Sequence, residues 1–180
     1  MSIKKSLPAN DKYFLLFLII YGYSFNKNKI KTTYEGNIQE LFFNGYSYKN
    51  IETNGTYLNQ SFSGQLKIDD PNVNLTSDMQ IDFSGNQPHI NLFSDIINFN
   101  FKKTNFTNDN LQLAGTLDVN FTGNNIDNFL GNATLLNAVI KNNEAEAQFD
   151  SLSLASIIKN SKKYLSLAGN DFLIDISGAK

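Results

Sequence analysis

From Thr32 onward, apolar and polar residues alternate along most of the chain. The sequence Met-Gln-Ile-Asp-Phe at residues 79–83 is one example. A two-residue period places the apolar side chains of a strand on one side of a sheet, whereas buried parallel strands read as continuous apolar runs. We therefore predict an all-β fold. It is an extended, curved antiparallel sheet that forms an open trough with one apolar face, with at most one or two short helices.

Turn residues divide this pattern into strands. Asn44-Gly45 and Asn54-Gly55 are typical of two-residue hairpin turns, and Asp69–Asn72 predicts a turn with Pro71 at its second corner. The two helix candidates are short. One is Ile126–Leu130, closed by a glycine, and the other is Leu154–Asn160.

The first 31 residues differ from the rest, so we predict a boundary between a lead at residues 1–31 and a β-trough segment at residues 32–180. The lead contains a short apolar run, Tyr13–Tyr21, which is about half the length of a membrane-spanning helix. The run is open to two interpretations. It is a signal or membrane anchor, or it is a buried strand or helix of a truncated chain.

Composition excludes several functional classes. The chain has no cysteine, no arginine and one histidine, and its formal net charge is −2. There is therefore no thiol chemistry, no bidentate guanidinium clamp and no basic face for nucleic acid. The single histidine, His89, is expected at a strand end. The segment that begins at Asp70 starts like an EF-hand calcium-binding loop, but it lacks the glycine and the glutamate that such a loop needs. We expect no enzyme activity, no catalytic residue, no metal and no cofactor.

Large apolar side chains on alternating positions are the candidate functional feature. They are either the core of a closed β-sandwich or the lining of a continuous trough that holds acyl chains, and the pattern alone does not decide between the two. The residues expected to line such a lipid groove are Phe62, Leu66, Ile68, Leu75, Ile81, Phe83, Leu117, Val119 and Phe121.

Residues 34–180 resemble the AsmA/TamB-like proteins of Gram-negative bacteria, and most of all the TamB-like translocation and assembly module proteins. The resemblance is carried by stretches in the same order as in that family. They are Leu41–Ile51 (LFFNGYSYKNI), Phe62–Gly64, Ile68–Leu75 (IDDPNVNL), Ile81–Phe83 and Leu117–Gly131 (LDVNFTGNNIDNFLG).

The resemblance implies a periplasmic location and an inner-membrane anchor in the full-length protein. It implies transport of phospholipid along an apolar β-groove for outer-membrane biogenesis, without catalysis. A second role that it implies is protein secretion, with an outer-membrane barrel assembly protein as partner and open strand edges as the contact. Members of the family are many times longer than 180 residues, so we expect this chain to be an internal or truncated fragment, with the membrane-associated parts elsewhere.

Overall fold

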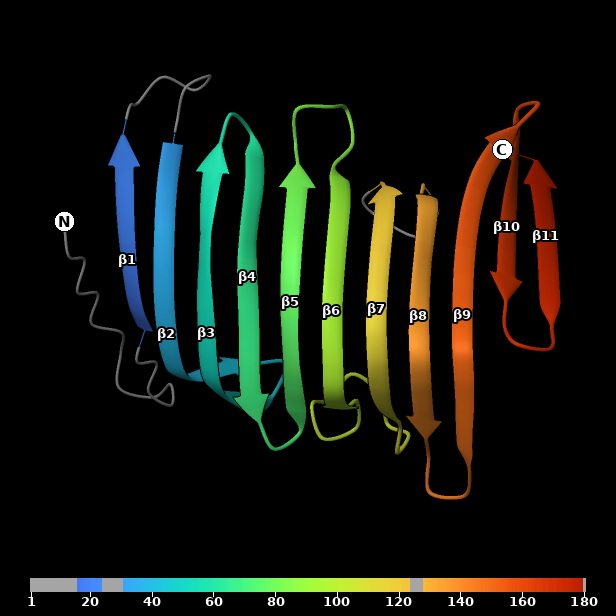
Figure 1. Ribbon diagram of the computed structural model, residues 1–180, viewed down its shortest axis with the longest axis horizontal. Coiled ribbons are helices and arrows are strands. Elements are labelled where there is room, and N and C mark those ends of the chain that lie inside the picture. The colour runs from blue at the N-terminus through green and yellow to red at the C-terminus, as the bar shows by residue number, and fades with distance from the viewer. Residues whose placement is uncertain (1–15, 24–30, 124–127, 180) are drawn as a thin grey trace.

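The computed structural model describes residues 16–23, 31–123 and 128–179, and these form one antiparallel β-sheet. Its strands lie side by side in chain order from β1 to β11 (Figure 1). The all-β, open-sheet architecture predicted from the alternation is thereby confirmed. The strands are β1 Leu16–Tyr23, β2 Lys31–Phe43, β3 Tyr46–Leu58, β4 Ser61–Asp70, β5 Val73–Asp82, β6 His89–Asn100, β7 Gln112–Thr122, β8 Leu130–Lys141, β9 Glu146–Lys159, β10 Lys162–Ala168 and β11 Leu173–Ala179.

None of the described residues is helical. The helix predicted at Leu154–Asn160 was wrong, because this segment continues β9 and Leu154 pairs with Leu167 of β10. Cross-strand pairing on both sides overrides the weak local helix preference. Of the other helix candidate, residues 126 and 127 lie outside the described residues, and Leu130 is the first residue of β8.

The apolar run near the start of the chain contributes a strand. Residues 16–23 form β1, which pairs antiparallel with residues 31–38 of β2. The boundary expected between residues 31 and 32 falls at the first residue of β2. The positions before Leu16, where the run begins, lie outside the described residues. In the part of the chain that is described, no helix has both the length and the apolar character needed to cross a bilayer.

Two of the three predicted turns are confirmed. Asn44 and Gly45 join β2 to β3 with φ values of 50° and 76°, the left-handed backbone that an Asn-Gly hairpin turn requires. Pro71 lies in the turn between β4 and β5.

The turn predicted at Asn54-Gly55 was wrong, because both residues lie inside β3. Gly55 faces Gly64 of β4, and a Cβ on Gly55 would lie 2.5 Å from the Tyr34 hydroxyl oxygen. The missing side chain of this glycine therefore leaves room for the Tyr34 side chain and for the Ser63 carbonyl oxygen of β4. The turn itself lies at Asn59-Gln60, where φ is 49° and 66°.

The tip of the β2–β3 hairpin folds back onto the sheet, and its far end lies behind β4 and β5 in Figure 1. This fold-back creates the main buried cluster, in which Ile38, Tyr48 and Ile51 meet Val73 of β5. The partly buried side chains around the cluster are Leu41, Tyr46, Leu66, Ile68, Leu75 and Phe99.

Candidate functional site

Strand register brings the predicted groove residues together. Directly opposed residues of neighbouring antiparallel strands project from the same side of a sheet. Phe62 of β4 opposes Ile81 of β5, which opposes Ile90 of β6, and Ile90 opposes Phe121 of β7. Eight of the nine predicted residues fall on this side of β4, β5 and β7, which we call the apolar face. They are Phe62, Leu66, Ile68, Leu75, Ile81, Leu117, Val119 and Phe121.

The ninth residue, Phe83, follows the last residue of β5 and is 49% exposed. Most of the other eight are half-buried, and Val119 is buried at 9% exposure. The described residues form a single sheet, so no second sheet of the described chain covers the middle of the apolar face. This arrangement is not the closed sandwich that the alternation left open.

The apolar face is wider than predicted. The residues of this face that the predicted groove lining did not include are Ile90, Leu92 and Ile96 on β6, and Leu135, Leu152, Leu154, Leu165, Leu167, Ile174 and Ile176 on β8–β11. On β6 the alternation is hard to see in the letters, because the apolar residues Phe93 and Ile97 stand at intervening positions and a serine, Ser94, stands at an apolar-face position. On β9 the alternation is present in the letters and could have been found.

A polar pair interrupts the apolar face near its middle. Ser77 of β5 and Ser94 of β6 oppose each other, with exposures of 5% and 3%, and their hydroxyl oxygens are 2.7 Å apart. The Ser94 hydroxyl also reaches the Thr76 carbonyl oxygen at 3.3 Å. The two hydroxyls are hydrogen-bonded to each other, so neither is an unpaired polar group in this buried position.

One end of the apolar face is covered by the hairpin tip. The buried carboxylate of Asp70 accepts hydrogen bonds from the Tyr46 hydroxyl at 2.5 Å and from the backbone N–H of Lys49 at 3.1 Å. At the turn, the Asn44 amide donates to the Asn105 carbonyl at 2.8 Å, and the Asn105 amide donates back to the Asn44 carbonyl at 3.0 Å. These contacts hold the tip against β4 and the β6–β7 loop.

Burial raises the pKa of the Tyr46 phenol above its ordinary value, and the hydrogen bond to Asp70 raises it further. Both causes favour the neutral phenol. The hairpin tip is therefore held by a protonated tyrosine that donates to a carboxylate.

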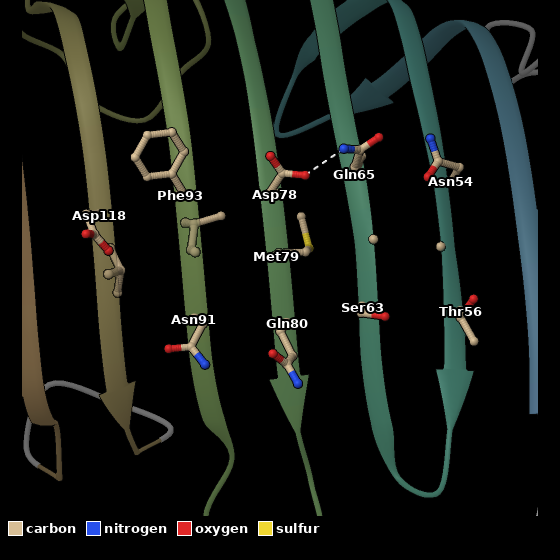
Figure 2. A pocket seen from close by; sticks show the side chains of 14 residues that line it. Asn54, Thr56, Ser63, Gln65, Asp78, Met79, Gln80, Asn91, Phe93 and Asp118 are labelled. Atoms are coloured by element: carbon tan, nitrogen blue, oxygen red, sulfur yellow. Dashed lines mark hydrogen bonds between the residues drawn. The ribbon is translucent and has the colours of Figure 1, made fainter.

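On β3–β7 the opposite face of the sheet is mostly polar, and we call this side of the sheet the polar face. Farther along, on β8–β11, the same side carries the exposed apolar side chains of Leu136, Ile157 and Leu173. A hollow of about 560 Å³ lies on the polar face across β3–β7 (Figure 2). Its floor includes the facing pair Gly55 and Gly64. The sequence interpretation missed this hollow, because the polar positions of an alternating strand read as an ordinary solvated surface.

The other sequence candidates have structural roles. His89 is the first residue of β6, as predicted, and its Nδ1 lies 3.1 Å from the Thr122 hydroxyl. Asp70 caps the Pro71 turn by accepting from the Asn72 N–H at 2.8 Å. Within the described ranges, no group of three or more histidine or acidic side chains is arranged to hold a metal ion.

Comparisons with known proteins give no match: no family model, curated protein or solved structure is significantly similar to this chain.

Proposed function

We propose that this chain binds the acyl chains of phospholipids on the apolar face of β4–β7, as a non-enzymatic segment of an AsmA/TamB-like periplasmic protein. The observation that carries the proposal is the shared side of eight alternating apolar residues, most of them half-buried with no facing sheet in the described chain. Apolar surface left in contact with water favours an apolar partner by about 25 cal/mol per Å² of area buried.

The mechanism is passive. Acyl chains lie against side chains such as Ile81 and Phe121, and headgroups stay in water beyond the sheet. The hairpin tip closes one end of this surface, since Tyr48 and Ile51 already pack there against Val73. Lipid therefore enters from the other end, where Phe62, Ile81 and Phe121 lie in one cross-strand row.

Site-specific photocrosslinking tests the proposal. A benzoylphenylalanine is placed at position 81 or 121 on the apolar face, and at the adjacent positions 80 and 120 on the polar face as matched controls. Each purified variant is irradiated with vesicles that contain radiolabelled phosphatidylethanolamine. We expect lipid adducts at 81 and 121 and little labelling at 80 and 120. Equal labelling of the two faces, or no adduct at either apolar position, would contradict lipid binding on this face.

A second candidate function is protein assembly through a sheet edge, which the exposed strand β11 favours. Ile174 and Ile176 on this edge strand are 49% and 59% exposed. An edge strand can pair with a client strand through its free backbone groups. Crosslinkers at positions 174 and 176 would then capture an outer-membrane β-barrel protein, whereas lipid transport predicts capture at 81 and 121.

A further inference from the structure

We infer that the hollow on the polar face is a binding site for an extended, uncharged glycan. The site lies on the side of the sheet opposite the proposed lipid surface, and it is independent of that proposal. Three observations support it: two straight rows of hydrogen-bonding side chains, an aromatic ring displayed among them, and the absence of basic residues from the described lining.

The two rows cross the sheet at right angles to the strands. In the first row, each residue opposes the next on the neighbouring strand, and the second row is offset by two residues along each strand. The first row is Asn54, Gln65, Asp78, Phe93 and Asp118, and the second is Thr56, Ser63, Gln80 and Asn91. All nine line the hollow, and Figure 2 shows them on the strands from β3 to β7.

The chemistry of these rows suits hydroxyl groups. Asn and Gln side chains each present a donor and an acceptor, and carboxylates accept, so a sugar hydroxyl finds both kinds of partner. Gln65 donates to Asp78 at 2.7 Å, which orients the amide and leaves the second carboxylate oxygen available. Strands lie about 4.8 Å apart, a spacing close to the length of one sugar ring in an extended glycan, so successive rings can meet equivalent partners.

Phe93 provides an apolar surface within the proposed glycan site. It is 46% exposed on the polar face, between Asp78 and Asp118 in the first row. The C–H faces of a pyranose ring are apolar, and an aromatic ring set among hydrogen-bonding groups can stack against them.

Charge narrows the ligand class. The described lining carries the carboxylates of Asp78 and Asp118 and includes no lysine. A phosphorylated or sulfated ligand would be repelled. A small cation could use the carboxylates and the ring, but it would leave the amide row of Gln80 and Asn91 unused. An uncharged glycan uses both rows.

Titration of the whole chain with cellotetraose and with tetra-N-acetylchitotetraose tests the inference, followed by isothermal calorimetry and by ¹H–¹⁵N NMR. We expect saturable binding of at least one, with shifts confined to β3–β7. Phe93→Ala should weaken that binding by about ten-fold through loss of stacking, and Gln80→Ala should also weaken it. Phe42→Ala removes an exposed phenylalanine outside the hollow and should bind as the native chain does.

Because Phe93 and Gln80 are exposed, both variants should fold, and circular dichroism checks this. No saturable binding of either oligosaccharide would overturn the inference. So would equal affinity of the Phe93→Ala and Phe42→Ala variants, or a preference for heparin or spermidine over both neutral glycans.

Discussion

Tyr46 and Asp70 show how one hydrogen bond can position a whole hairpin. The Asp70 carboxylate is buried and accepts from the Tyr46 hydroxyl and from two backbone N–H groups. The Asn72 amide in turn donates to the Tyr46 hydroxyl at 2.9 Å. A buried carboxylate that loses a hydrogen-bond donor still bears the free-energy cost of being removed from water. Loss of one hydrogen bond among Tyr46, Asp70 and Asn72 should therefore destabilise the others.

Tyr46→Phe should lower the free energy of unfolding by about 1.5–3 kcal/mol, the range for hydrogen bonds to charged groups. Urea unfolding measures this loss. Tyr164→Phe, at a more exposed tyrosine on β10, is the control and should change stability by less than about 0.5 kcal/mol. An equal loss in the two variants would show that the Asp70 contact contributes nothing specific.

The same pair predicts a dependence on alkaline pH. The folded state raises the pKa of Tyr46 above its ordinary value, because burial and Asp70 favour the neutral phenol. The stabilisation that Tyr46 gives to the folded state is therefore present in full below the pKa of about 10 that tyrosine has in the unfolded chain, and it is lost as the pH rises through the pKa of Tyr46 in the folded state. The stability difference between native chain and Tyr46→Phe should be constant up to about pH 10 and shrink above it. A difference that persists unchanged at higher pH would contradict this origin.

Gly64 illustrates a second constraint at the residue scale. A Cβ at this position would lie 2.5 Å from the Asn54 carbonyl oxygen and 2.6 Å from the Tyr34 hydroxyl. Gly64→Ala should therefore cost about 1–3 kcal/mol through overpacking, measured by urea unfolding. Gly85→Ala in the β5–β6 loop is the control, because the nearest atom there is 3.3 Å away. Equal stability of Gly64→Ala and the native chain would mean that β3 and β4 can separate at no cost.

At the scale of elements, the β2–β3 hairpin is bent at Asn50. This residue has a φ of 51°, and its amide donates to the Asp69 carbonyl at 3.0 Å. In a regular strand, residues three apart face opposite sides, yet Tyr48 and Ile51 are buried in the same cluster. The left-handed backbone between them reverses the alternation and turns the tip onto the apolar face.

Asn50→Val should straighten or weaken this bend, because left-handed backbone costs a residue with a Cβ about 1–2 kcal/mol, and a β-branched side chain is the least tolerant. Hydrogen exchange at the backbone N–H of Lys49, which is bonded to Asp70, should accelerate. Asn50→Gly keeps the conformation accessible and should retain most of the protection. Equal acceleration in the glycine and valine variants would show that the Asn50 side-chain hydrogen bond, which both variants lose, holds the bend rather than the backbone geometry.

The alternation of apolar and polar residues predicted those features of the strands that depend only on neighbouring residues in the sequence. The two-residue period placed Phe62, Ile81 and Phe121 on one face, because side-chain direction in a strand depends only on parity. It failed at Asn54-Gly55, where turn chemistry is overridden by the cross-strand partner Gly64. The folded-back tip depends on Tyr46 and Asp70, which are 24 residues apart, and no local period encodes such a contact.

At the scale of the whole molecule, the sheet separates two kinds of surface. One side carries the apolar residues of the proposed lipid surface, and the other carries the polar rows around Phe93. With its strands in sequential order, the sheet grows along a single direction. Each added strand extends the apolar face and the polar face together, so adding hairpins would lengthen both proposed binding surfaces.

Strand β11 is the outermost strand at one side of the described sheet. Ile174 and Ile176 are exposed there, and such an edge promotes pairing between copies of a chain. We expect this chain to associate with increasing concentration, and Ile176→Lys to reduce the association, because a charge on an edge strand disfavours pairing. Sedimentation velocity over a concentration series measures this, with Ile176→Val as the control that keeps an apolar edge. Association of the lysine variant equal to that of the valine variant would place the contact elsewhere on the molecule.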